Sequence, residues 1–259
     1  MIRLRPLRPR EQRNLRHWAM ELVVVVVGVM IALWASEWAE EQRQRAELKR
    51  VEADMIEELK SNVFAVEVHA TMRPCFINRA TEIRDLLIAS DGTWPGLESG
   101  TVFATNLIPL RFPSVFSYPS LRPTIEYWRY GEETGLTRLM DPERRRKFAV
   151  AYGQSENAIR QMNRVVEKRA ELSGLVYPGS LTPEMRNEAI GALRELDSGL
   201  WVLDTGYSDL IESVRALGIR SGEEWERNAK RFLDQDAQSG EYAPCVRELT
   251  NPLATELAE

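Results

Sequence analysis

The sequence predicts an all-α protein: a single N-terminal transmembrane helix, then an irregular helical bundle with one long aromatic and proline-rich loop. Residues 22–35 form an uncharged, strongly apolar run. Beyond it, apolar residues recur at steps of three and four over most of the chain, which is typical of amphipathic helices. Asp141-Pro142 and Thr182-Pro183 each join a capping residue to the residue suited to a first helical turn.

The transmembrane helix is expected over residues 18–38, WAMELVVVVVGVMIALWASEW. At 1.5 Å per residue this helix spans about 32 Å, which matches the hydrocarbon thickness of a bilayer. Trp18 at one end and Trp34 with Trp38 at the other lie where indole rings favour the headgroup boundary. A cleaved secretory signal is the alternative, but Leu33 and Trp34 occupy positions where an export peptidase needs small residues. We therefore expect an uncleaved anchor.

The positive charge at the two ends of the span predicts its orientation. The expected basic tail, residues 1–17, carries six arginines and one acid, whereas four Lys and Arg residues follow the span within a similar distance. Basic residues favour the cytoplasmic side, so we expect a cytoplasmic tail and an extracytoplasmic helical domain over residues 39–259. The tail is +5 and the chain −5, which leaves −10 on the remainder. An acidic domain argues against a nucleic-acid partner, and membrane lipid is the first partner expected.

Small residues form one face of the expected span. Gly28, Ala32 and Ser36 recur every four residues, and Glu21 lies within about 20° of the same face. Small residues let two helix backbones approach closely, so this face predicts helix packing and self-association. Glu21 is either an interfacial carboxylate that reaches the headgroups or a polar contact across a helix–helix interface.

A stalk and first helix are expected over residues 39–72, with an apolar stripe that forms either a bundle core or a coiled coil with a second copy. Pro74 is expected to interrupt or restart the helix, and helical spacing then continues to about Ala89. Residues 90–123 are expected to form a long loop that packs on the helices, with a short strand around residues 101–107. Loops of this length in compact domains tend to be functional or disordered. The aromatic residues here and just beyond are therefore the expected partner surface: Trp94, Phe103, Phe112, Phe116, Tyr118 and Trp128.

Further helices are expected after the loop. A short helix through Trp128 is expected to close at Gly131, and a longer one to run from Pro142 to about Leu172. The next helical tract, residues 184–217, is expected to break near residues 198–206, where two glycines lie.

The C-terminal part predicts one last helix and a tail. Ser221 with Glu224 three residues later forms a capping box for a helix to about residue 238. Residues 239–259 are then a tail. A disulfide between the two cysteines, Cys75 and Cys245, would tie that tail to the first helices if the domain is exported. It would close a loop of about 170 residues and stabilise the fold by about 5 kcal/mol on chain entropy; two unrelated thiols are the alternative.

No residue set predicts catalysis, a metal site or a cofactor. The two histidines, His17 and His69, match no zinc-ligand spacing with the cysteines, and no phosphate loop, HExxH or GxSxG motif occurs. Adjacent acids such as Glu57 and Glu58 point about 100° apart on a helix, which predicts solvated faces. The basic cluster at residues 144–147 lies just inside a helix start, where cations oppose the helix dipole. It is either solvated or in contact with an anionic partner or headgroup.

Two stretches, ELVVVVVGVMIALWASEWAEE and PSLRPTIEYWRYGEETGLTRLMDPERRRKFAVAY, resemble a widespread family of uncharacterised single-pass bacterial membrane proteins. The first is similar to that family's anchor, in which a Glu opens an aliphatic span that ends in Trp and acids. The second is similar to its short helix, Gly-centred turn and following helix. The resemblance implies the bacterial inner membrane, this topology and this fold. It implies no catalytic residue, because the family has no assigned activity.

We therefore expect a membrane-anchored helical interaction, scaffold or accessory protein that acts outside the cytoplasm and is not an enzyme. Its expected partners are its own copies or another membrane or periplasmic protein. The alternative is a membrane-tethered hydrolase built on carboxylates, which requires two acids that converge in a concave pocket. A ligand sensor with a cytoplasmic output is disfavoured, because a tail of 17 residues is too short for an output domain.

Overall fold

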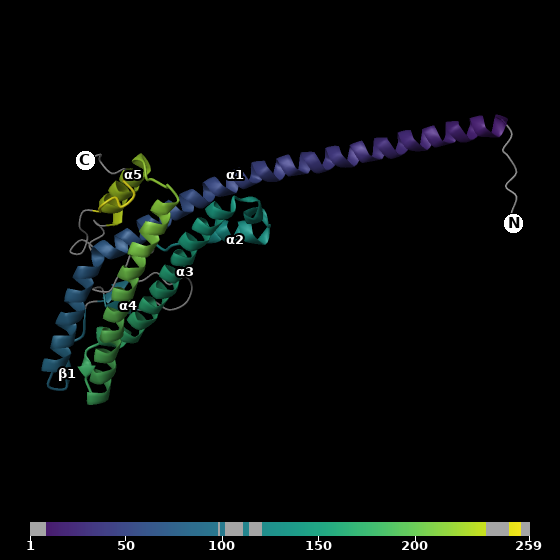
Figure 1. The fold of residues 1–259 in the computed structure, drawn as a ribbon. Helices are drawn as coiled ribbons and strands as arrows, with labels where there is room; N and C mark the ends of the chain where they lie inside the picture. The colour runs from purple at the N-terminus through teal and green to yellow at the C-terminus, as the bar shows by residue number, and fades with distance from the viewer. Residues whose placement is uncertain (1–8, 98, 102–110, 114–120, 237–248, 255–259) are drawn as a thin grey trace. The chain divides into compact units, whose positions relative to one another are not determined.

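The computed structural model describes residues 9–97, 99–101, 111–113, 121–236 and 249–254 (Figure 1). The chain is mostly helical, which confirms the all-α class. The helices are α1 (Pro9–Ala89), α2 (Glu126–Glu133), α3 (Pro142–Glu171), α4 (Pro183–Ala216) and α5 (Glu223–Arg231). Short helical turns are η2 (Leu136–Leu139), η3 (Leu172–Val176) and η4 (Phe232–Asp236), and the strands are β1 (Thr93–Trp94), β2 (Ser99–Thr101), β3 (Arg111–Pro113) and β4 (Gly179–Ser180). The chain divides into two units, Met1–Arg50 and Val51–Glu259.

Unit 1 contains the expected membrane span. In the described part of the chain, α1 is the one helix long and apolar enough to cross a membrane, and its most apolar window has a mean hydropathy of 2.1 with none of it buried. The three boundary tryptophans are exposed by 71% (Trp18), 68% (Trp34) and 56% (Trp38). A span whose apolar side chains have no protein cover is what a lipid-facing helix requires.

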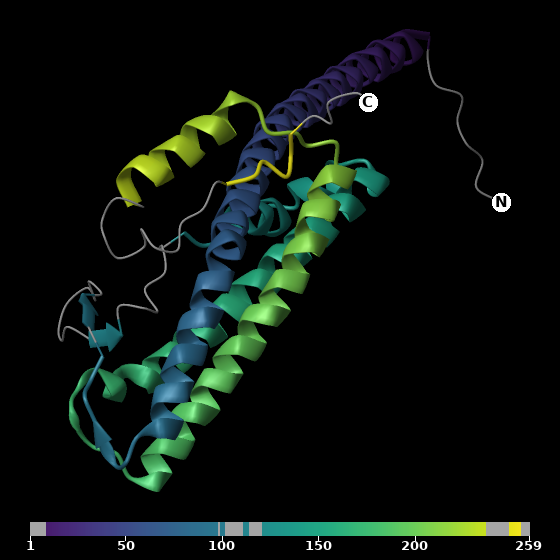
Figure 2. The same ribbon diagram turned by 90° about the vertical axis from the view of Figure 1, so that its left-hand side faces the viewer.

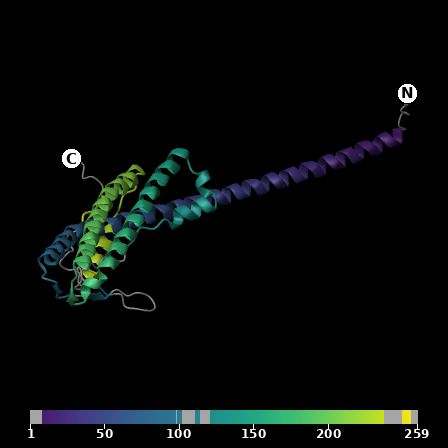
Figure 3. The same ribbon diagram turned by 90° about the horizontal axis from the view of Figure 1, so that it is seen from below.

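Unit 2 is built around three long helices, and Figures 2 and 3 show α3 and α4 beside the later part of α1. The apolar stripe predicted on the first helix forms the core of this bundle, so its face is covered by the same chain. The buried stripe consists of Val51, Met55, Leu59, Val63 and Val66. Facing it are the apolar sides of α3 and α4, which include Phe148, Tyr152, Met162, Leu196, Leu203 and Leu210.

The expectation that Pro74 interrupts or restarts the first helix is wrong, because α1 continues through it to Ala89. A proline inside a helix costs about 3 kcal/mol. Met72 and Phe76 on either side are buried, and burial of two such side chains contributes about as much or more. Packing therefore keeps the segment helical, and α1 changes direction before it reaches β1 (Figure 1).

The expected break at residues 198–206 is also wrong, since α4 runs unbroken. Gly199 and Gly206 are seven residues apart and share one helix face. A Cβ on Gly199 would lie 3.3 Å from Val165 Cγ2, and one on Gly206 would lie 3.6 Å from Asn157 Nδ2. Both neighbours belong to α3, so these glycines allow two helices to pack closely. They do not end one.

Gly131 has the same role in α2. The helix was expected to close there, but it continues to Glu133, and the left-handed residue after it is Gly135 (φ 77°). A Cβ on Gly131 would lie 2.7 Å from Met55 Cε and 3.0 Å from Thr137 Cγ2. The missing side chain lets α2 lie directly against α1.

The loop after α1 contains three short strands in its described parts. β1 pairs antiparallel with β4, Thr93 opposite Ser180, and β2 pairs with β3. Most of the strand expected at residues 101–107 lies outside the described residues. Trp94 is 3% exposed, and its indole N–H donates to the Leu175 carbonyl oxygen at 2.7 Å. The loop is thus packed on the helices at this point, as expected.

The predicted capping box at α5 is wrong. Gly222 is the N-cap residue and no side chain caps this helix. The Ser221 hydroxyl instead donates to Asn251 Oδ1 at 2.6 Å, and Leu253 is buried. Residues 249–254 of the predicted tail therefore belong to the folded unit.

Candidate functional site

The small-residue face of the expected span is open in this chain. Glu21, Gly28, Ala32 and Ser36 are all exposed. No atom lies within 4 Å of a Cβ built on Gly28. In contrast to Gly131, Gly199 and Gly206 of unit 2, Gly28 therefore has no packing neighbour among the described residues that accounts for its missing side chain.

A buried polar cluster lies at the centre of unit 2, around a carboxylate that was expected to be solvated. Glu58 is only 6% exposed. Its Oε1 accepts hydrogen bonds from Thr124 Oγ1 (2.8 Å) and the Glu126 backbone N–H (2.7 Å). Its Oε2 accepts from the Tyr127 backbone N–H (3.2 Å) and the Tyr152 hydroxyl (2.7 Å). The adjacent Glu57 is exposed, as expected.

Glu58 acts as the N-terminal cap of α2 from another helix. The residue at the N-cap position, Ile125, makes no side-chain capping bond. The first backbone N–H groups of a helix have no intrahelical acceptor, and the Glu58 carboxylate accepts two of them. A negative charge at a helix N-terminus is also favoured by the dipole. Two elements remote in sequence are joined in this way.

Two more polar residues on the same face of α1 bind the same segment. Asn62 accepts from the Thr124 backbone N–H (2.8 Å) and donates to its carbonyl oxygen (2.7 Å). His69 Nε2 lies 2.9 Å from the Leu121 carbonyl oxygen, so this nitrogen carries the proton. Positions 58, 62 and 69 fall within about 40° on a helix. This spacing is visible in the sequence, and it is the signal that could have identified the cluster.

The cluster is suited to holding the fold together. Four donors from the chain itself occupy the oxygens of the Glu58 carboxylate. Burial and the neighbouring Glu58 carboxylate raise the pKa of Tyr152 well above its ordinary value. Burial lowers the pKa of His69 from its usual 6.5 to about 4.

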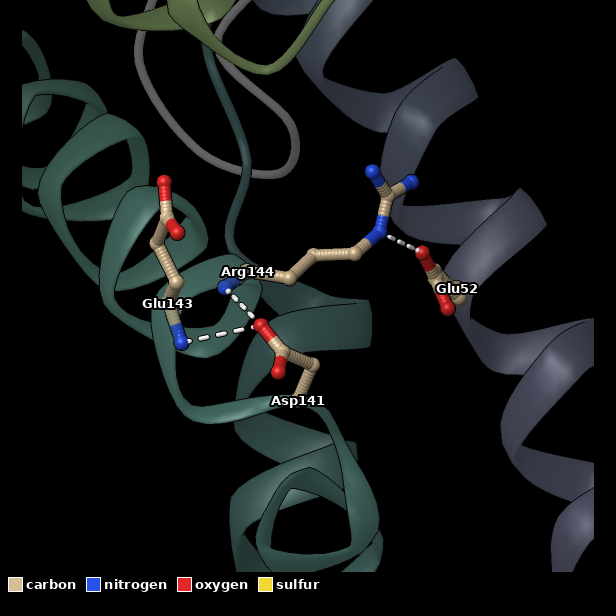
Figure 4. Close-up of polar contacts among 4 residues, drawn as sticks. All are labelled: Glu52, Asp141, Glu143 and Arg144. Atoms are coloured by element: carbon tan, nitrogen blue, oxygen red, sulfur yellow. Dashed lines mark hydrogen bonds and ion pairs between the residues drawn. The ribbon is translucent and has the colours of Figure 1, made fainter.

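The start of α3 is the second polar site (Figure 4). The Asp141 carboxylate accepts from the backbone N–H groups of Glu143 and Arg144, each at 3.0 Å, which confirms the predicted cap. The Arg144 guanidinium forms an ion pair with Glu52 of α1 and lies 5.4 Å from the centre of the Phe148 ring. Lys147 pairs with Glu143 at 3.2 Å. Two cations of the basic cluster are thus paired within the chain.

Two shallow grooves lie in unit 2. One of about 130 Å³ lies between α1 and α5, and its lining includes Glu57, Lys60, Phe64, Glu224 and Trp225. Lys60 forms an ion pair with Glu57 at 2.6 Å. The other, of about 230 Å³, is lined by Arg215, Gly218, Ile219, Arg220, Leu253 and Ala254.

The expected aromatic partner surface is only partly described. Trp94 and Trp128 are buried, and Trp128 stacks on Tyr152 at 5.3 Å, so these two tryptophans belong to the core and not to an exposed surface. Phe112 lies on β3. Phe103, Phe116 and Tyr118 lie outside the described residues.

No group of three or more His, Cys, Asp and Glu residues that could hold a metal ion occurs in the part of the chain that the structure describes. Cys75 is half-buried on α1. Cys245 lies outside the described residues, so the disulfide stays a prediction.

No protein-family model, curated protein or solved structure matches this chain. The fold and site define a helical protein with one candidate membrane span among the described residues. The resemblance to single-pass bacterial membrane proteins stays a prediction.

Proposed function

We propose that this chain is a single-pass membrane protein of the bacterial inner membrane, whose unit 2 serves as an interaction, scaffold or accessory module outside the cytoplasm. The observation that carries the proposal is the exposed apolar length of α1 in unit 1. In water, such a surface is far larger than a soluble monomer tolerates. The excess of arginine in residues 1–17 supports the orientation.

Insertion and orientation are tested with the full chain in bacterial cells. Alkaline carbonate extraction separates an inserted helix from a peripheral one, and we expect the protein to stay in the membrane pellet. Phosphatase and fluorescent-protein fusions at the C-terminus then report its side, and we expect phosphatase activity without fluorescence. A fluorescent fusion without phosphatase activity would contradict the orientation, and release by carbonate would contradict the anchor.

The proposed self-association runs through the small-residue face of the span. A Cβ at position 28 has no atom of the described residues within 4 Å, so we expect an effect of Gly28→Leu on assembly to report on a second helix. We expect Gly28→Leu to weaken chemical cross-linking between copies in mild detergent. Val23→Leu, on the opposite face, adds bulk without touching the small-residue face and is the control. Equal cross-linking in both variants would contradict this interface.

A carboxylate-based hydrolase remains the second candidate, and the groove between α1 and α5 favours it because two acids, Glu57 and Glu224, line it. Two observations count against a hydrolase: both carboxylates are exposed, and Glu57 is paired with Lys60. Hydrolysis of ester or glycoside reporter substrates that is lost in Glu224→Gln would support this candidate. No hydrolysis by the wild-type chain would count against it.

A further inference from the structure

The first three turns of α3 carry a cationic and apolar face that points away from the core. Its members fall within an arc of about 100°, all are exposed, and none is acidic: Arg146, Ala149, Val150 and Gly153. The opposite side of the same turns is buried and includes Phe148, Ala151, Tyr152 and Ser155. We call the first set, with Arg145 at its border, the outward face of α3.

The two arginines at the outward face are not in ion pairs with the part of the chain that the structure describes. Arg144 and Lys147 pair with Glu52 and Glu143, whereas neither Arg145 nor Arg146 forms an ion pair with a carboxylate among the described residues. Cations in the first turns of a helix oppose the helix dipole. An anionic surface against this face would offset that effect.

Exposed apolar side chains accompany these cations. Val150 is 51% exposed, and Leu139 of η2, three residues before the first turn of α3, is 47% exposed next to the exposed Arg138. Interleaved arginines and aliphatic side chains are typical of surfaces that lie at the headgroup level of a bilayer. A soluble acidic partner would satisfy the arginines but would not require the exposed aliphatic residues.

A short stretch of chain joins this face to the proposed anchor. The ion pair between Arg144 and Glu52 joins the start of α3 to the first residues of unit 2 (Figure 4). Only thirteen residues lie between Trp38 and Glu52, and a chain of that length spans at most about 50 Å. A tether of this length raises the effective concentration of headgroups, so that weak contacts become significant.

We propose that the outward face of α3, with Arg138 and Leu139, docks on anionic phospholipid headgroups of the membrane in which α1 is anchored. The inference rests on the proposed membrane anchor. The arginines bind the phosphates, while Val150 and Leu139 enter the interfacial layer. Unit 2 then lies against the bilayer, and the lipid composition controls how firmly it does so.

The test is photo-cross-linking of the full chain in nanodiscs. p-Benzoylphenylalanine replaces Val150 in one sample and the exposed Trp201 of α4 in a matched control. The nanodiscs contain phosphatidylcholine alone or with phosphatidylglycerol, and mass spectrometry measures lipid adducts. A third sample carries the probe at Ile31, within the anchor.

We expect lipid adducts at position 150 several-fold above those at position 201, only with phosphatidylglycerol. Arg145→Gln and Arg146→Gln should each lower the yield roughly fivefold, and about 1 M salt should suppress it by screening. Arg160→Gln on the same helix should leave it unchanged.

Equal yields in the two lipid mixtures, or equal yields at positions 150 and 201, would overturn the inference, as would adducts to a second copy of the chain in place of lipid. The probe at position 31 separates this failure from that of the anchor. If position 31 gives lipid adducts and position 150 gives none, only the headgroup contact is wrong. If position 31 gives none, the proposed anchoring is wrong as well.

Discussion

Glu58→Gln tests whether a buried carboxylate on α1 holds α2 in place. The substitution keeps the shape of the side chain but replaces one acceptor oxygen with an NH₂ group. Each oxygen accepts one hydroxyl and one backbone N–H, so one part-buried backbone N–H of α2 loses its acceptor in either orientation. The Tyr152 hydroxyl retains the Met55 carbonyl oxygen at 3.1 Å.

The expected loss is about 3 kcal/mol in the free energy of unfolding. An orphaned buried donor costs about 1–3 kcal/mol, and hydrogen bonds to a charged acceptor are worth about 1.5–3 kcal/mol each. The neighbouring Glu57→Gln provides the control. It removes an exposed ion pair with Lys60, for which at most about 1 kcal/mol is expected.

The measurement is urea unfolding of the full chain in detergent micelles, followed by tryptophan fluorescence. A double-mutant cycle with Tyr152→Phe isolates the coupling between the hydroxyl and the carboxylate, which we expect to be about 1–2 kcal/mol. The reasoning is refuted if Glu58→Gln and Glu57→Gln lower the unfolding free energy equally, or if the cycle shows no coupling.

Three further predictions follow from burial, close packing and compartment. Because the folded-state pKa of His69 is lowered from 6.5 to about 4, neutral His69 contributes its full share to the free energy of unfolding above pH 6.5, and this share is lost as the pH falls toward 4. His69→Gln should therefore remove about 3 kcal/mol of the pH dependence of the unfolding free energy, measured by unfolding at several pH values. Gly191→Ala has open space at its Cβ and should stabilise α4 by about 1 kcal/mol. Gly131→Ala should give an unfolding free energy about 1–2 kcal/mol lower than that control, because its Cβ would contact neighbouring side chains. Equal shifts of the melting temperature in the two variants would contradict the packing role of Gly131. Alkylation of intact cells should leave Cys75 and Cys245 unmodified until reductant is added, and modification without reductant would contradict both the disulfide and the exported location.

The sequence predicted those features whose cause is local. Asp141 and Thr182 begin α3 and α4 as expected, because a cap needs only the oxygen of one side chain and the next three residues. The apolar stripe of the first helix is the core face of the bundle, since steps of three and four place its residues on one side. Neither inference depends on what lies opposite.

The wrong boundaries share one physical cause. Helix propensity alone predicts breaks at Gly131, Gly199 and Gly206 and an interruption at Pro74, because each of these residues lowers it. The low helix propensity of a glycine costs about 1 kcal/mol and that of a proline about 3 kcal/mol. The free energy gained by burying side chains against a neighbouring helix exceeds these costs. A glycine that ends a helix and one that packs against another helix look alike in a single sequence.

In the polar cluster, too, the sequence predicts the local feature and the tertiary structure decides the rest. Glu57 and Glu58 are adjacent and chemically identical. Glu58 alone becomes a buried cap, because the segment at residues 121–127 packs against it. The sequence by itself determined the class, the apolar span and the core face, because these follow from composition and helical period. Only the tertiary structure decided which glycines are contacts and which carboxylate is buried, since both depend on partners tens of residues away in the chain.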